Sequence, residues 1–286
     1  MNVLKTGFLL ALLTVVLVFL GQLMGGGQGA MVAFGFALVM NFVMYWFSDK
    51  IVLAMYRAKP LLETEAPQVY RAVREISSRI HIPMPRLYWI STRTPNAFAT
   101  GRSPKHAAVA VTSGLVELMS EEELKGVLAH ELSHVTNRDT LVMTIAAALA
   151  GAIMMLARMA QWSMWMGGGS RDRGSHRGNG AIQLVVMLLI AILAPLAAML
   201  IQMAISRTRE YGADESGARL AGTPHGLASA LEKLHQASHD YPMPNANPAT
   251  AHLFIVNPLS AGGIANLFST HPPMEERVRR LRSMRL

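Results

Sequence analysis

The sequence predicts an α-helical integral membrane protein with about four transmembrane segments and a mixed α+β domain outside the bilayer. Composition is the first observation. Of the 286 residues, 51% are hydrophobic and only 15% are charged, and the mean hydropathy is +0.29, whereas a soluble domain of this size is usually richer in charge. The second observation is a set of long uncharged runs that can span a bilayer. The third is the helix and strand patterning between these runs.

The first two apolar runs lie near the N-terminus, at residues 8–24 and 30–47. A short uncharged linker joins them, so we expect a tight transmembrane hairpin over residues 1–47. The first run has the character of a signal peptide, but no A-x-A cleavage site follows and the second run begins at once. Basic residues flank both ends of the hairpin, so the positive-inside rule places both ends in the cytoplasm.

Residues 48–140 have the character of a soluble domain, and we expect them to face the cytoplasm. Apolar residues at helical spacing predict a helix over 64–80, with Pro67 near its first turn. Three short runs bounded by Pro, Gly and basic residues predict strands at 87–90, 96–100 and 107–112.

A capped helix follows these strands and carries the sequence His-Glu-Leu-Ser-His. Ser120 and Glu123 have the spacing of a capping box at its start. His130 and His134 are four residues apart, so on a helix they project from one face and can bind one zinc ion at about 2.0–2.1 Å. Glu131 projects at the neighbouring angle, from which it can take a proton from water on the metal. The alternative is two surface histidines on a polar helix face.

Residues 207–214 supply a candidate third ligand, which would leave the fourth metal position open for water. Glu210 and Asp214 are four residues apart on a predicted helix, so both carboxylates face one side. We assign Glu210 to the metal and Asp214 to the outer N–H of a ligating histidine, where it fixes the tautomer and raises basicity. The alternative is a solvated helix face on which Arg207 and Arg209 pair with these acids. Arg207 is also a candidate contact of the substrate or of the ligands.

Residues 141–205 form a second hydrophobic hairpin in our interpretation, with apolar runs at 141–166 and 181–205 around a Gly/Arg-rich loop at 167–180. Because Glu210 must meet the two histidines around one ion, the chain between them crosses the membrane an even number of times. Two crossings or none are therefore allowed. We favour two crossings, since runs of about 25 residues have the reach, although three arginines in the loop oppose its export.

Residues 206–286 complete the predicted cytoplasmic domain. They contain a helix from Thr223 to about Ser238, then a Pro/Asn-rich loop at 241–258 that is a candidate lid over the substrate. His271 precedes two prolines, so it cannot lie in a helix interior. A basic helix over 274–284 is expected to be solvated or to rest on anionic lipid. Its arginines and the one that follows are Arg277, Arg279, Arg280, Arg282 and Arg285.

Together these motifs resemble the HtpX family of bacterial membrane zinc metalloproteases, which are relatives of the CAAX prenyl endoproteases. With the hydrophobic layout, the resemblance covers nearly the whole chain. It implies a zincin-like, gluzincin-type catalytic domain in which one zinc ion is bound by His130, His134 and Glu210 and Glu131 is the catalytic base. Ser133 departs from the Gly of many relatives, at a position that faces away from the metal. The matching stretches are 95–101, 130–139, 209–214 and 270–277.

The resemblance also implies a multi-pass protein of the bacterial inner membrane whose catalytic domain faces the cytoplasm. Its substrates would be misfolded or damaged membrane proteins under stress. In zinc proteases an edge strand binds the peptide in extended form, and we expect residues 96–100 to be that strand. Asn96 could then orient the substrate or the oxyanion, although Asn after Pro is also a common turn residue. His271 would lie near the active site, with structural packing as the equal alternative.

Other functions fit the composition less well. The chain has no cysteine, which excludes disulfides and cysteine-based metal or nucleophile chemistry. A net charge of +8 suits a nucleic-acid binder, but no recognition motif occurs and the cations lie beside hydrophobic runs. An anionic membrane surface is therefore the expected partner, besides protein substrates. A transporter would place more ionisable residues inside its spans, a silent scaffold would have lost a required residue, and a CAAX prenyl endoprotease would have more spans.

Overall fold

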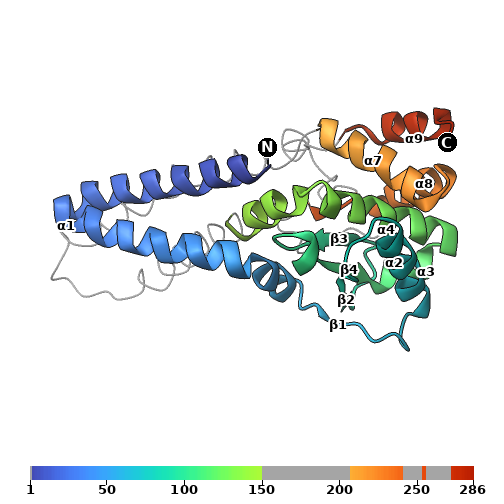
Figure 1. Cartoon of the computed structure of the whole chain (residues 1–286), viewed down its shortest axis with the longest axis horizontal. Helices are drawn as coiled ribbons and strands as arrows, with labels where there is room; N and C mark the ends of the chain where they lie inside the picture. Colours follow the sequence, from blue (N-terminus) through green and yellow to red (C-terminus); the bar gives the residue numbers. More distant parts are fainter. Residues whose placement is uncertain (1, 150–206, 241–252, 256–271) are drawn as a thin grey trace, which may run out of the picture.

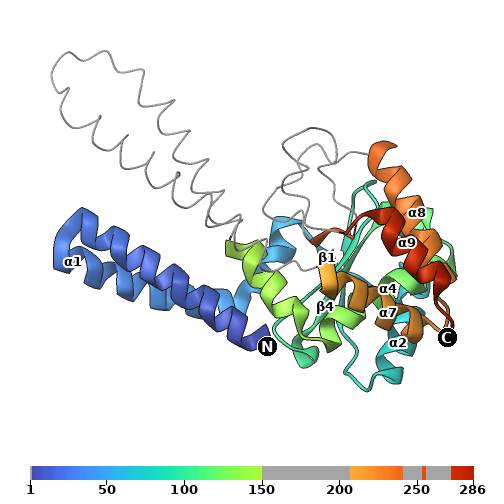
Figure 2. The same cartoon turned by 90° about the horizontal axis from the view of Figure 1, so that it is seen from above.

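The computed structural model describes residues 2–149, 207–240, 253–255 and 272–286. A hairpin of two long helices extends like an arm from a mixed α+β body (Figure 1). Viewed at right angles, the arm still projects from one side of the body (Figure 2). The helical hairpin and the α+β body are therefore two distinct parts of the described molecule.

The arm is helix α1, Asn2–Met55, which is bent back on itself at two glycines. Gly26 has a φ of 59° and a ψ of −147°, a backbone conformation that only glycine adopts at low cost. The two limbs then run antiparallel (Figure 1). Between them, the Nδ2 atom of Asn41 donates a hydrogen bond of 2.8 Å to the hydroxyl of Thr14. A polar pair inside an apolar hairpin fixes the relative position of the limbs.

Among the described residues, one helix is long and apolar enough to cross a membrane, Gly25–Met55. It contains the predicted span 30–47, and the first limb contains the predicted span 8–24. The structure therefore contains the N-terminal hairpin, and its described residues do not confirm four transmembrane segments. Most of the predicted second hairpin, from residue 150 to residue 205, lies outside the described residues.

A four-stranded sheet with the order β1-β2-β4-β3 forms the centre of the body. β2 and β4 are parallel, and the two outer pairings are antiparallel. The three predicted strands are present to within one residue, and β3 is an edge strand. The two-residue β1 was not predicted because it is too short to show any alternation. The strands are β1 Lys59–Pro60, β2 Arg86–Ile90, β3 Ala97–Thr100 and β4 Ala108–Thr112.

Helices cover the two faces of this sheet. The predicted helices at 64–80, 223–238 and 274–284 are present with slightly shifted ends, whereas the short α3, which directly follows β4, was not predicted. The helices of the body are α2 Pro67–Arg79, α3 Ser113–Leu118, α4 Glu121–Thr136, α7 Arg207–Ala221, α8 His225–Asp240 and α9 Met274–Ser283. An apolar helix, Asp139–Leu149, continues the chain beyond α4.

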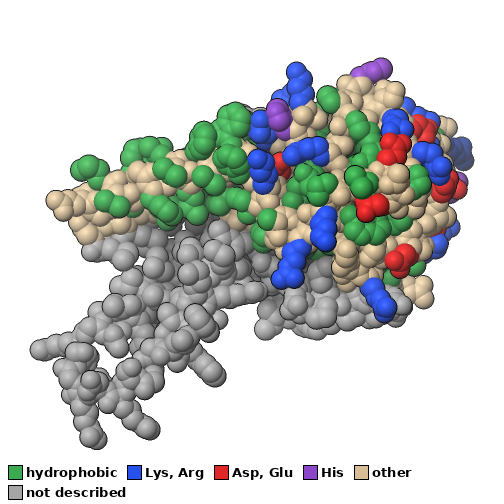
Figure 3. Space-filling view, turned by 90° about the horizontal axis from the view of Figure 1, so that it is seen from below, with side chains coloured by type: hydrophobic (Ala, Val, Ile, Leu, Met, Phe, Trp, Pro, Cys, Tyr) green, Lys and Arg blue, Asp and Glu red, His purple; other side chains and the backbone are tan. Residues whose placement is uncertain are grey.

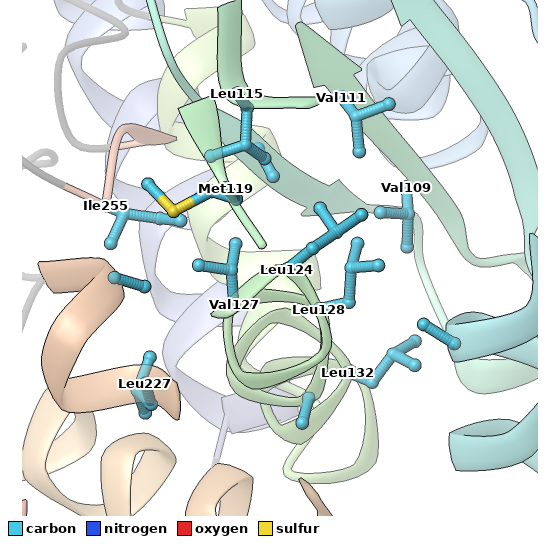
Figure 4. Packing of buried hydrophobic residues seen from close by; sticks show 14 of the residues in the cluster. Val109, Val111, Leu115, Met119, Leu124, Val127, Leu128, Leu132, Leu227 and Ile255 are labelled. Carbon is cyan, nitrogen blue, oxygen red and sulfur yellow. The ribbon is translucent and has the colours of Figure 1, made fainter. Parts of the chain in front are cut away.

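Strand β4 separates two hydrophobic clusters by the alternation of its side chains. Val109 and Val111 face α4, where they meet Leu124 and Leu128 (Figure 4). The neighbouring alanines of β4 belong to the opposite cluster, which contains the end of α1 and the helix after α4. Helix α8 adds Leu227 to the far side of α4 (Figure 4). Because α4 is enclosed by the sheet and by α8, its remaining face can be buried only against α7 and the edge of the sheet.

Candidate metal centre

Helix α4 begins with the predicted capping box. The hydroxyl of Ser120 accepts a hydrogen bond of 3.3 Å from the backbone N–H of Glu123, whose carboxylate accepts one of 2.8 Å from the N–H of Ser120. This pair sets the first turn of the helix and therefore the direction of every later side chain. The rings of His130 and His134 lie on one face, with centroids 4.9 Å apart, as their spacing predicted.

Helix α7 approaches α4 closely enough for its carboxylates to reach these rings. At Gly217, an added Cβ would lie 2.9 Å from the Cα of His130, so a larger residue would force the helices apart. Glu210, in the first turn of α7, then lies 3.7 Å from the Nε2 atoms of both His130 and His134. The three side chains are buried, with 1%, 3% and 4% exposure for His130, His134 and Glu210.

The donor atoms of His130, His134 and Glu210 fit a metal ion. All three lie within 4.8 Å of one another. A tetrahedral zinc ion with bonds of about 2.0–2.2 Å needs ligand atoms roughly 3.4 Å apart, close to the 3.7 Å found between the carboxylate and each ring. Two imidazole nitrogens and one carboxylate oxygen form a ligand set that leaves a position open for substrate or water. The structure brings together the three residues that the sequence offered as metal ligands.

Two further carboxylates face the outer nitrogens of the same rings. Asp214 lies 3.0 Å from Nδ1 of His130, and Asp139 lies 3.3 Å from Nδ1 of His134. Such contacts place the ring N–H on Nδ1 and turn the Nε2 lone pair toward the metal. Asp214 was predicted in this position. No role was predicted for Asp139, although it follows the motif by only five residues. Arg138, with a φ of 57°, separates α4 from the helix that begins at Asp139.

The carboxylates around His134 favour the protonated form of its ring. Burial alone lowers the pKa of this imidazole, but the hydrogen bond with Asp139 and the nearby carboxylates of Glu210 and Glu131 outweigh burial and raise the pKa to about 9. A metal ion binds only the neutral ring, so it must displace this proton. The carboxylates thus favour a positive charge at this position, which either a proton or a metal cation can supply.

Glu131 lies between the histidines and the edge of the sheet. Its Oε2 atom accepts a hydrogen bond of 2.8 Å from the backbone N–H of Ala99 in β3. Burial raises the pKa of Glu131, and this effect exceeds the lowering by His130 and His134. A carboxylate whose pKa is raised is better suited to take a proton and return it near neutral pH.

Arg277 corrects one sequence prediction. Helix α9 was expected to be solvated or to rest on lipid, yet this arginine is 0% exposed. Its guanidinium donates hydrogen bonds of 2.8 and 2.7 Å to the two oxygens of Asp214 and lies 3.6 Å from Glu210. Burial by itself raises the pKa of Asp214, but the charge and hydrogen bonds of Arg277 outweigh burial and bring that pKa below its usual range. The remaining arginines of α9, such as Arg279, are exposed as predicted.

The other predicted site residues lie in different surroundings. Asn96 is buried, and its Oδ1 atom accepts a hydrogen bond of 3.3 Å from the N–H of Ile255. Arg277 donates to the carbonyl of the same residue at 3.1 Å. Arg207 is exposed at the first position of α7. His271 lies outside the described residues.

The space beside the ligands is small. A cavity of about 10 Å³ is lined by residues of α4, β3 and α7 and by the segment Leu253–Ile255, which was part of the predicted lid. This volume is about that of one water-sized sphere. The segment therefore covers the candidate metal ligands, and both backbone polar groups of Ile255 are held: its N–H donates to Asn96, and its carbonyl accepts from Arg277.

The chain is similar to known peptidases over nearly its whole length. Residues 63–285 match the family model of Peptidase family M48. The chain is 60% identical to "Protease HtpX homolog" of Syntrophobacter fumaroxidans over 280 residues, which cover 98% of each chain. It is 54% identical to the protein of the same name from Thermococcus sibiricus over 282 residues, covering 98% of this chain and 95% of the relative.

A solved structure shares the fold. The crystal structure of S. mikatae Ste24p superimposes with a TM-score of 0.51 at 20% sequence identity, covering 96% of this chain and 62% of that chain. The chain thus spans about three fifths of the length of that protein. At this identity the likeness concerns the fold alone.

Proposed function

This chain belongs to peptidase family M48 and is a membrane-associated metallopeptidase, and from that premise we propose that it is a zinc-dependent endopeptidase. In this proposal His130, His134 and Glu210 bind the metal, one ion per subunit, and Glu131 is the catalytic base. The main support is the convergence of three buried donor atoms within 4.8 Å, contributed by two helices that are far apart in the sequence.

The chemistry is divided between the metal and Glu131. Zinc at these ligands supplies a Lewis acid that polarises a peptide carbonyl and makes water acidic near neutral pH. The Oε2 atom of Glu131 is held by the N–H of Ala99, so we assign the proton transfer to Oε1. Glu131 accepts a proton from the attacking water and then gives it to the nitrogen of the leaving amine. Asp214 and Asp139 keep the rings of the two histidines oriented meanwhile.

The substrate is proposed to bind as an extended peptide along β3. This strand lies at the edge of the described sheet, and its residue Ala99 contacts the catalytic base. An edge strand offers unpaired backbone groups to a peptide in extended form. The segment Leu253–Ile255 borders the same cavity, so a bound peptide would have to displace it.

We further propose a multi-pass protein of the bacterial inner membrane with its catalytic body in the cytoplasm. Lys50 lies near the end of the second limb of α1, and Arg57 and Lys59 follow that limb, in agreement with the positive-inside rule. Misfolded or damaged membrane proteins are the proposed substrates, in quality control under stress, as the resemblance to the HtpX family implies.

The test compares Glu131→Gln with the wild-type protein, both purified in neutral detergent, loaded with zinc and incubated with an unfolded membrane protein. We expect unchanged zinc content and loss of cleavage, because the amide cannot accept the proton. Glu122→Gln is the matched control, since Glu122 lies on the same helix but is exposed, and it should cleave normally. Equal cleavage by the Glu131→Gln and wild-type proteins would remove the proposed mechanism, and no cleavage by any of them would favour a scaffold.

A further inference from the structure

A second hollow lies where the arm meets the body. Its volume is about 640 Å³, and it shares no lining residue with the cavity at the metal ligands. The second limb of α1 provides one wall, and the loop between β3 and β4 provides the other. Figure 3 shows Lys and Arg side chains gathered at this junction, beside the hydrophobic surface of the arm. The residues that line the hollow are Phe42, Trp46, Phe47, Asp49, Lys50, Met84, Arg86, Arg102, Lys105, His106 and Ala107.

The hollow has an excess of positive charge. Arg86 pairs with Asp49 at 2.7 Å, which neutralises one cation. In the part of the chain that the structure describes, Lys50, Arg102 and Lys105 have no ion pair with an acidic side chain. Three cations are therefore available to an anionic ligand.

Aromatic rings hold two of these cations in place. The guanidinium of Arg102 lies 4.4 Å from the centre of the Trp46 ring, and the ammonium of Lys50 lies 5.2 Å from the centre of the Phe47 ring. A cation–π contact orients a cation without using its N–H donors. These donors can then bind phosphate oxygens, for which a guanidinium is especially well shaped.

The order of residues along α1 indicates the depth of the hollow in a membrane. Exposed apolar side chains come first, for example Val32 and Phe36. Exposed aromatic residues follow at Tyr45 and Trp46, and then Lys50. This order of apolar, aromatic and basic residues is that of a helix passing from the hydrocarbon core through the headgroup layer. The hollow therefore opens at the level of the lipid phosphates when α1 is inserted.

We propose that this hollow binds the headgroup of an anionic phospholipid from the membrane that α1 enters. The phosphate would lie between Arg102 and Lys105, and the glycerol and first methylene groups would contact Trp46 and Met84. A free phosphate ion offers the same charge but would leave the apolar wall unused, which is why we assign the site to a lipid. The proposal rests on the insertion of α1 and is independent of the peptidase chemistry.

The test measures lipid retention by the full chain in neutral detergent, using native mass spectrometry during titration with phosphatidylglycerol or phosphatidylcholine. The wild-type protein should retain one phosphatidylglycerol at concentrations at which phosphatidylcholine is not retained. Each cation near a membrane surface contributes about fivefold to the attraction of anionic lipid. The double variant Arg102→Gln/Lys105→Gln should therefore bind phosphatidylglycerol roughly 25-fold more weakly.

The matched control, Arg219→Gln/Arg282→Gln, removes two exposed cations from α7 and α9, which do not line the hollow. It should bind phosphatidylglycerol within twofold of the wild-type protein, because a cation attracts the lipid only over a short distance. Lys50→Gln replaces the test variant if Arg102→Gln/Lys105→Gln does not fold, and it should weaken binding about fivefold. Equal retention of the two lipids, equal weakening in the control, or displacement of the lipid by an equal concentration of inorganic phosphate would overturn the proposal.

Discussion

Replacing Arg277 by methionine tests how the metal ligands are held. The arginine is fully buried and makes two hydrogen bonds, of 2.7 and 2.8 Å, to Asp214. Removing one partner of a buried ion pair leaves the other charge uncompensated, at a cost of about 3–5 kcal/mol. For a protein of this size that corresponds to a fall in Tm of roughly 6–20 °C.

The effect should extend to the metal, because Asp214 contacts His130 at Nδ1. Loss of an outer contact of this kind weakens metal binding by about 10–100-fold. Thermal unfolding of the metal-free Arg277→Met protein in detergent measures the first effect, and competition with a zinc chelator measures the second.

A second substitution separates the two effects. Adding Asp214→Asn to Arg277→Met removes the uncompensated charge, so Tm should partly recover while zinc affinity stays low. The exposed pair of Arg279 with Glu276 provides the control, and Arg279→Met should change the free energy of unfolding by less than about 1 kcal/mol. An unchanged Tm for Arg277→Met, or no recovery in the double variant, would refute the ion-pair explanation.

Four further predictions concern the candidate ligands and the helices that carry them. Zinc affinity should rise about tenfold per pH unit up to a pH of about 9, because His134 must release a proton; a flat profile in chelator competition would contradict this. The raised pKa also stabilises the metal-free fold below pH 6.5, and that contribution should be lost as the pH rises through 9, as urea unfolding can show. Gly217→Ala should separate α7 from α4, lowering stability by about 1–3 kcal/mol and weakening zinc binding; an unchanged affinity would count against the close approach. Ser120→Ala should cost about 1 kcal/mol in urea unfolding through loss of the cap, with unchanged zinc content.

The alignment of the candidate ligands on their helices could be predicted because helical geometry fixes the direction of side chains four residues apart. The pairs His130 with His134 and Glu210 with Asp214 each lie on one helix, so periodicity alone aligns them. The capping box of α4 was predictable for the same reason: its two residues are neighbours in sequence.

The contacts that were missed depend on tertiary structure. Arg277 was predicted to be exposed because an isolated arginine is costly to bury; its burial requires Asp214, which lies on a different helix. Asp139 follows the end of α4, and its position depends on the left-handed conformation of Arg138. Patterns within one segment contain no information about such partners.

The candidate ligands come from two helices, one before and one after residues 150–206 in the sequence. A bound ion would therefore act as a cross-link. His130 and His134 precede that stretch, and Glu210 follows it. Like a disulfide, the ion would close a long loop of chain and restrict the unfolded state more than the folded one. A protease cut inside the loop should accordingly leave two fragments that stay together with the metal and separate more readily after chelation.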